Sequence, residues 1–416
     1  MKARPLLGLV VAQSLAYAGT RLAMIALPWF VLQTTGSPAH MGVVTAVEMG
    51  SYGTARLLGG PIMDRIGHRT VGVWADAAAA LALLGVPLLH QADLLSFPLL
   101  LVLVMLVGLS TGPAEAAKVS LTPFVAEVSG APMERVTGLT GTVGPVVAGA
   151  VVAAAGVMPA FHLTAALMLS AALVLLFFVP LERPGTDVHA DPEAGAGYPE
   201  RLRTGWTAVW SDVPLRVVVC AVLVMNIIDV TVSTVILPVW VDARGHGPGT
   251  VGLIAGVMGA TAVAGAALAA WLGHRLPRVP TLVAALLVSG APRLTALALD
   301  LPLWAVLVVW GVGGFGSGFV NPILSVVILE RLPRHVVGRG MAMTGALTRL
   351  GVPLGAPVLG ALVGIVGTAP VLLGSAVVYA LIATVPANRR ISAGIARCPS
   401  GNEEGPDGPS SADRAG

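Results

Sequence analysis

The sequence predicts an all-α polytopic membrane protein in which twelve transmembrane helices form two six-helix halves. The first observation is composition: 56% of the 416 residues are hydrophobic and only 11% are charged, whereas soluble proteins carry about 25% charged residues. The second is a series of long apolar runs, since an α-helix needs about 20 apolar residues to cross a bilayer. The third is an internal repeat that relates the second half of the chain to the first.

Hydropathy divides the chain into spans, loops and two polar segments. Residues 1–181 hold the first six predicted spans, and residues 214–388 hold the other six. A polar cytoplasmic linker, 182–213, joins these halves, and the tail 389–416 is polar enough to be disordered. The predicted spans are 6–33, 39–63, 70–90, 95–125, 135–157, 159–181, 214–242, 249–273, 279–299, 302–330, 336–366 and 369–387.

Basic residues indicate which ends of the spans face the cytoplasm, because cytoplasmic loops carry an excess of lysine and arginine. Outside the spans or at their ends, basic residues lie in the N-terminal segment, the even-numbered loops, the linker and the tail, and only Arg244 lies in an odd-numbered loop. Both termini are therefore predicted to be cytoplasmic. Lys2 and Lys118 are the only lysines, a bias typical of GC-rich bacteria, so we expect a bacterial plasma (inner) membrane.

The two halves repeat one another at a constant offset along the chain. One offset superimposes Pro28 on Pro238 and also Arg65 on Arg275. Prolines and a loop arginine that match at one offset are more informative than matching apolar residues. Parallel six-helix repeats are typical of secondary transporters, in which the substrate site lies near the midplane between the repeats.

A short polar loop between the second and third spans carries the most distinctive motif. Its defining residues are Gly60, Asp64, Arg65, Gly67 and Arg69. Gly60 permits close helix packing and Gly67 permits a tight reversal. The loop resembles the signature of the major facilitator superfamily, G-x-x-x-D-R-x-G followed by two basic residues, and departs from it at His68. The resemblance implies that Asp64 holds one transporter conformation closed, and a generic basic turn is the alternative.

Two further motifs resemble exporters of this superfamily. Gly144, Pro145 and Gly149 in the fifth span are similar to the end of the motif that its antiporters carry there, which implies export. A kinked helix that packs through small residues is the alternative. The segments 26–29 and 35–38 resemble those of actinobacterial drug, macrolide and siderophore exporters. The fourth span lacks the arginine of proton-coupled drug exporters, so the resemblance does not carry proton coupling to this chain.

Several charged side chains fall inside the predicted spans, where each costs about 2.5–3.5 kcal/mol at the bilayer centre. Four of these charged residues have no simple structural interpretation: Arg21, Glu48, Asp229 and Arg349. Asn226 lies one turn from Asp229 on the same face of its helix. We expect Arg21, Glu48, Asn226 and Asp229 to line a central substrate site. Glu48 is expected to pair with Arg21, because adjacent helices bring similar depths together. Salt bridges that only hold the bundle together are the alternative.

Other charges in the spans have simpler interpretations. Glu115 and Lys118 are three residues apart, share one helical face and are expected to pair with each other. Arg293 is expected nearer the outer surface than the centre. Asp76 lies close to the loop between the second and third spans.

A proton-driven transporter needs a membrane carboxyl that takes up and releases a proton in each cycle. Asp229 and Glu48 are the candidates. A nearby cation stabilises a charged carboxylate, and Arg21 is expected beside Glu48. Asp229 has no equally obvious cation within its own helix, so Asp229 is the preferred site of protonation.

Together these features predict a secondary transporter that works by alternating access and exports a small, partly apolar organic compound. The expected partners are this compound, the lipid bilayer and, if transport is coupled, protons. We expect a monomer. We also expect no nucleic-acid partners, since the basic residues lie in loops. The sequence contains no P-loop, histidine ligand cluster or serine-hydrolase motif with a plausible triad, so we expect no enzyme, cofactor or metal. An importer of a small metabolite and a receptor on a transporter fold are the alternatives.

The distribution of basic residues makes the topology testable. A reporter fused after Asn388 should behave as cytoplasmic, and a reporter inserted within Asp242–Gly247 should behave as external. Paired alkaline phosphatase and green fluorescent protein fusions measure the two locations. An external C-terminus would contradict the predicted topology.

Overall fold

The computed structural model describes residues 3–129, 157–181, 198–272, 275–332 and 337–388. These ranges are helical between short turns. The first helices are α1 (Ala3–Thr35), α2 (Pro38–Leu58), α3 (Gly60–Ile66), α4 (His68–Gln91), α5 (Phe97–Ser129) and α7 (Val157–Phe178). The helices that follow are α8 (Tyr198–Ser211), α9 (Val213–Thr231), the π-helix η1 (Val232–Ile236), α10 (Leu237–Asp242), α11 (Pro248–Leu272), α12 (Arg278–Ser289), α13 (Ala291–Ala298), α14 (Leu303–Arg331), α15 (Val337–Leu350), α16 (Val352–Val366), α17 (Thr368–Thr384) and the 3₁₀-helix η3 (Val385–Ala387).

Ten helical segments of the described chain are long and apolar enough to cross a membrane. The second predicted span, 39–63, is not among them, and the structure divides it between α2 and α3. The fifth predicted span, 135–157, lies almost entirely outside the described residues. The all-α membrane fold is confirmed, whereas the number of twelve spans stays a prediction.

Local sequence explains where several helices begin. The Ser37 side chain accepts a hydrogen bond from the His40 backbone N–H at the start of α2, and Asp212 does the same for Leu215 at the start of α9. Such caps satisfy backbone donors that have no partner within the helix. Gly67 has φ +92° between α3 and α4, which confirms the tight reversal expected at this glycine.

Helix α8 lies in the segment predicted as a polar linker, 182–213, so that description was incomplete. Trp206 and Trp210 stack with ring centroids 4.5 Å apart, and Val209 is fully buried in a small core shared with Leu215 and Leu347. Helix α8 packs against α15 and α9. Apolar residues three or four positions apart give α8 a buried face, which average polarity conceals.

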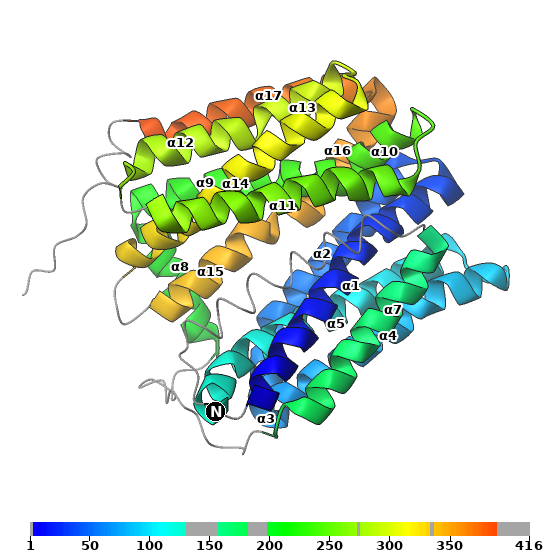
Figure 1. The fold of residues 1–416 in the computed structure, drawn as a ribbon, viewed down its shortest axis with the longest axis vertical. Coiled ribbons are helices and arrows are strands. Elements are labelled where there is room, and N and C mark those ends of the chain that lie inside the picture. The colour runs from blue at the N-terminus through cyan, green and yellow to red at the C-terminus, as the bar shows by residue number, and fades with distance from the viewer. Residues whose placement is uncertain (1–2, 130–156, 182–197, 273–274, 333–336, 389–416) are drawn as a thin grey trace, which may run out of the picture.

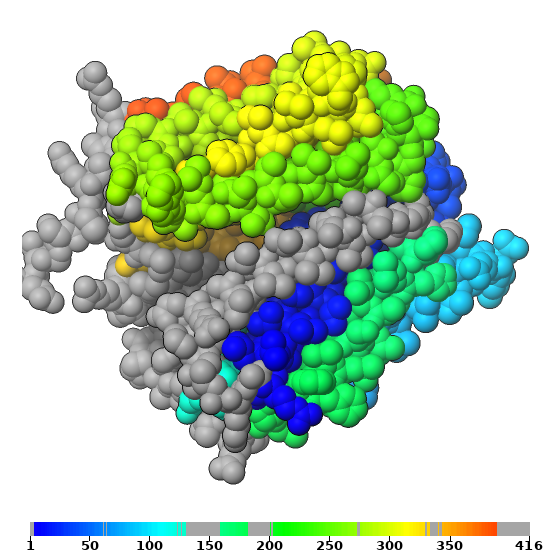
Figure 2. All heavy atoms as spheres, viewed as in Figure 1, coloured from blue at the N-terminus to red at the C-terminus, as the bar shows by residue number. Residues whose placement is uncertain are grey.

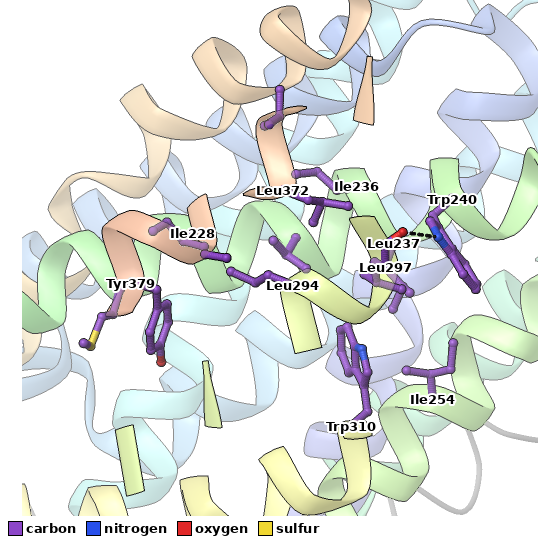
Figure 3. Close-up of a cluster of buried hydrophobic side chains, with 14 of the residues drawn as sticks. Ile228, Ile236, Leu237, Trp240, Ile254, Leu294, Leu297, Trp310, Leu372 and Tyr379 are labelled. Carbon is purple, nitrogen blue, oxygen red and sulfur yellow. Dashed lines mark hydrogen bonds between the residues drawn. The ribbon is translucent and has the colours of Figure 1, made fainter. Parts of the chain in front are cut away.

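The described helices pack into two groups. The N-terminal group contains α1, α2, α3, α4, α5 and α7, and the C-terminal group contains the helices from α8 to η3 (Figure 1). Each group is built around one large apolar cluster, although Trp29 of α1 belongs to the cluster of the C-terminal group and Val235 of η1 to that of the N-terminal group. Figure 3 shows the core of the C-terminal group, where the Trp240 indole N–H donates to the Leu297 carbonyl over 2.9 Å. This bond ties α10 to α13.

The two groups meet through a close approach of α2 to α16. A Cβ atom added to Gly42 would lie 2.6 Å from the backbone oxygen of Ala356, and one added to Gly360 would lie 2.7 Å from that of Pro38. Glycine therefore allows backbone to contact backbone. Helix α1 also contacts α10 and α11. In Figure 1 the groups lie together near α10 and diverge toward α3 and α8.

The outer surface suits a lipid environment. On the face of the molecule that Figure 2 shows, α11, α12 and α13 lie on one side and α1 and α7 on the other. Helix α7 exposes Leu169, Leu173 and Phe177, and α11 and α14 expose Leu253 and Val308. Apolar side chains can point outward in a bilayer because lipid, not water, surrounds them.

Candidate functional site

One side of α2 carries polar residues toward the C-terminal group. Thr45, Glu48, Tyr52 and Arg56 follow at spacings of three or four residues and therefore share a face of the helix. The Thr45 hydroxyl donates to the Thr234 hydroxyl of η1 over 3.2 Å. This polar face lies next to the glycine-mediated contact between α2 and α16.

Tyr52 is the centre of a polar network that joins both groups. Its hydroxyl donates to Glu115 of α5 and accepts a hydrogen bond of 2.6 Å from Arg56. Arg56 also lies 3.3 Å from the Glu115 carboxylate. Arg349 of α15, in the other group, lies 3.5 Å from the Tyr52 hydroxyl. Both guanidinium groups lie 5.9 Å from the centre of the Tyr52 ring, a distance at which cation–π attraction operates.

Helix α1 adds two residues to this network. Tyr17 interacts electrostatically with Glu115, Arg21, Arg349 and Arg56. Arg21 lies one turn from Tyr17 and is exposed. We call this set the tyrosine–arginine cluster: Tyr17, Arg21, Tyr52, Arg56, Glu115 and Arg349.

A small cavity of about 50 Å³ adjoins the cluster. Among the residues that line it are Gln13, Tyr17, Thr20, Tyr52, Thr111 and Glu115. No role was expected of Tyr17 or Tyr52 from the sequence. The regular spacing of Glu48, Tyr52 and Arg56 along one apolar span was a signal that could have revealed this face.

Asp76 and Lys118 form a buried ion pair between α4 and α5. The Lys118 amine lies 2.7 Å from Asp76, and the two side chains are only 2% and 4% exposed. The predicted pair between Glu115 and Lys118 was therefore wrong. These residues do share a side of α5, but neighbouring helices supply nearer partners: Glu115 reaches Arg56 on α2, and Lys118 reaches Asp76 on α4.

Asp229 also has a partner that sequence analysis missed. Arg293 of α13 donates to the Asp229 carboxylate and is itself 2% exposed. Its guanidinium group lies 5.4 Å from the Trp310 ring centre and 6.0 Å from that of Tyr379. The expectation that Arg293 lies nearer the outer surface than the centre took no account of this pairing. Asp229 was preferred for protonation because its own helix offers no obvious cation, and Arg293 of α13 removes the basis of that preference.

The other expected site residues are not gathered into one site. The Asn226 side-chain N–H donates to the Thr348 carbonyl over 2.9 Å, which joins α9 to α15. Glu48 is 7% exposed and has no ion-pair partner among the described residues, whereas Arg21 contacts the sulfur of Met24 at 3.7 Å. The predicted Arg21–Glu48 pair is thus not formed.

The loop motif lies at the end where the two groups diverge. Gly60 begins α3, and Asp64 and Arg65 lie within this short helix. Arg69, at the start of α4, donates to the carbonyls of Leu175 and Leu176 in α7, which ties α4 to α7. The role expected of Asp64 stays a prediction. The helix-5 residues Gly144, Pro145 and Gly149 lie outside the described residues.

The described ranges contain no candidate metal site, since their His, Cys, Asp and Glu residues form no group of three or more that could hold an ion. Charged groups are instead paired between neighbouring helices, as Asp76 is with Lys118 and Asp229 with Arg293. A sequence profile of the Major Facilitator Superfamily matches residues 9–246 and 219–390. The chain belongs to the major facilitator superfamily. It is a transporter and not an enzyme.

The chain is also similar to transport proteins in sequence and, at low identity, in fold. The chain is 28% identical over 380 residues to the multidrug efflux pump Tap of Mycobacterium tuberculosis, covering 86% of this chain and 87% of Tap. Tap of Mycolicibacterium fortuitum is 27% identical over 378 residues, covering 88% and 91%. A mutant of the nucleoside transporter NupG superimposes with a TM-score of 0.78 at 14% identity, covering 94% of this chain and 100% of NupG. A D-xylose–proton symporter gives 0.69 at 16% identity, covering 91% and 96%.

The buried Asp76–Lys118 pair yields a stability prediction. Lys118→Met should lower the free energy of unfolding by about 3–5 kcal/mol, because it leaves the Asp76 carboxylate buried without a partner. The double variant Asp76→Leu, Lys118→Met should recover most of this loss. Unfolding in mixed micelles, followed by tryptophan fluorescence, measures both. Arg203→Met on the exposed face of α8 is the matched control. Equal stability of Lys118→Met and the control would contradict a structural role for the pair.

Proposed function

We propose that this transporter is an efflux permease for a small, partly apolar organic compound. The observation that carries the proposal is similarity, over 86% of the chain, to proteins named as multidrug efflux pumps. The resemblance of the fifth span to an antiporter motif is consistent with export. The solved structures of low identity support only the fold and leave direction open.

We further propose that residues 1–181 and 214–388 are two halves that alternate in access. The N-terminal and C-terminal groups contact each other through α2 and α16 and through α1 and α10, and they diverge toward α3 and α8 (Figure 1). Arg65 and Arg69 lie at the diverging end, and basic loops favour the cytoplasmic side. This arrangement therefore corresponds to a state that faces the cytoplasm, from which an exporter takes its substrate.

The tyrosine–arginine cluster is the proposed substrate site. Tyr52 from the N-terminal group and Arg349 from the C-terminal group come together there, so a bound compound would contact both halves. Arg21 belongs to this site as sequence analysis expected. Asn226 instead joins α9 to α15 through its hydrogen bond to Thr348. Asp229 joins α9 to α13 through its ion pair with Arg293.

Glu48 is the proposed site of proton coupling, in place of Asp229. Its side chain is buried between Thr45, which bonds to the C-terminal group, and Tyr52, which Arg349 contacts. A charged carboxylate is costly to bury without a counter-charge, and the described residues supply none. Movement of the halves that exposes Glu48 to water would remove this cost and release a proton. Asp229 keeps Arg293 beside it, which stabilises its charged form.

Inverted membrane vesicles test direction and coupling together. Vesicles that contain the transporter should accumulate at least one of carboxyfluorescein, Nile red and ethidium when their interior is acidified by respiration. An uncoupler should abolish this accumulation. Accumulation only in right-side-out vesicles would indicate an importer and overturn the proposed direction.

A variant and its matched control test which carboxyl group couples transport to the proton gradient. Glu48→Gln, a neutral mimic of the protonated acid, should reduce gradient-driven accumulation about tenfold or more while substrate exchange without a gradient persists. Glu127→Gln, which removes an exposed carboxyl from the same group of helices, should behave as the parent. If Glu48→Gln accumulates the dye normally and Asp229→Asn does not, Asp229 is the coupling residue and the assignment of Glu48 is wrong.

A further inference from the structure

The small cavity of about 50 Å³ lies inside the N-terminal group, beside the buried Asp76–Lys118 pair. Helices α1, α2, α4, α5 and α7 all contribute to its wall, and its polar lining includes Gln13, Thr20, Asp76, Thr111, Glu115 and Lys118. Sites for drug-sized molecules measure about 300–1,000 Å³, so the cavity is far too small for an organic compound. One water molecule needs only about 10–15 Å³ of such space, so the cavity has room for a small cluster of water molecules.

Two buried oxygen atoms at the cavity lack hydrogen bonds from the described residues. They are Gln13 Oε1 and Asp76 Oδ2, and both residues are more than nine-tenths buried. The Lys118 amine donates to the other carboxylate oxygen, Asp76 Oδ1, over 2.7 Å. The amine is equally close to Oδ2 but is not aligned to donate to it. Buried polar atoms in native proteins are nearly always satisfied by protein or by ordered water, so both oxygens indicate a donor from within the cavity.

The remaining polar groups distinguish between the possible ligands. The Thr20 and Thr111 hydroxyls donate to carbonyls of their own helices, each over 2.9 Å. A hydroxyl has one hydrogen, so these two groups offer only acceptors to the cavity. The Lys118 ammonium carries three N–H donors, and Asp76 is its partner among the described residues.

Water is the small ligand that suits this combination. An anion would meet the acceptors and the Asp76 and Glu115 carboxylates, and a metal ion would meet the positive charge of Lys118. A water molecule both donates and accepts, and buried water typically makes about three hydrogen bonds to otherwise unsatisfied polar groups. It can therefore donate to Gln13 Oε1 or Asp76 Oδ2 and accept from Lys118.

We propose that the cavity binds a small cluster of water molecules that connects Gln13 and the Asp76–Lys118 pair to Glu115. The cluster joins α1, α4 and α5 by hydrogen bonds that their own side chains do not make. Glu115 also accepts a hydrogen bond from Tyr52, which Arg349 contacts. The hydrogen-bonded network thus extends from the contact between the two groups to the buried ion pair. This site goes beyond the proposed function, since it supports the N-terminal group whichever compound is transported.

Met168 reports on water in the cavity, because it lines the cavity although it is only 1% exposed. Met41 is the matched control: it is 0% exposed, belongs to the same apolar cluster and does not line the cavity. The full-length protein in nanodiscs is frozen and irradiated with X-rays, so that hydroxyl radicals form from water in place and do not diffuse from the bulk. Mass spectrometry measures methionine sulfoxide. Met168 should be oxidised at least about tenfold faster than Met41, and equal rates would overturn the proposal.

Two independent changes to the lining locate the water. Gln13→Leu and the double variant Asp76→Leu, Lys118→Met should each slow the oxidation of Met168 about threefold or more relative to Met41, because cavities with apolar walls stay dry. Ser14→Ala is the control variant: Ser14 is buried on α1, bonds to the Val10 carbonyl and does not line the cavity. It should leave the oxidation of Met168 unchanged. Fast oxidation of Met168 in both apolar variants, or an equal decrease in Ser14→Ala, would contradict the assignment of the water to these polar groups.

Discussion

The contact between α2 and α16 constrains the rest of the molecule. Gly42 and Gly360 let the two backbones touch, so neither helix can rotate or slide there without a clash. This contact directs one face of α2 toward the C-terminal group. The same face then places Thr45 against Thr234 and Tyr52 beside Arg349. The position of the proposed site therefore follows from a contact that involves no charged group.

Ion pairs join neighbouring helices inside each group. Asp76 with Lys118 and Asp229 with Arg293 each join two helices of one group. Removing one partner of such a pair is costly, because the other charge stays buried. Each group can therefore move as a unit without breaking these pairs. The contact between Arg349 and Tyr52 is different, since it crosses from one group to the other and would change when the groups move.

Sequence alone predicted the membrane fold, the family and the position of most spans, because hydropathy and loop chemistry are local properties. It also predicted the reversal at Gly67. It did not predict which charges pair. Hydropathy gives the depth of a residue such as Glu48 or Arg21, but not the direction in which its helix turns that residue. Glu115 and Lys118 share a side of α5, yet their partners lie on α2 and α4, and only the packing of three helices decides this.

Distances between spin labels test the alternation of the two groups most directly. One pair, His40→Cys with Ile365→Cys, spans the end where the groups meet, and another, Ile66→Cys with Val326→Cys, spans the diverging end, both in a background without Cys220 and Cys398. Electron–electron double resonance in nanodiscs at acid and alkaline pH measures both. If the two groups alternate, any population with a longer first distance has a shorter second one. Two distances that stay fixed under all conditions, or that lengthen together, would contradict it.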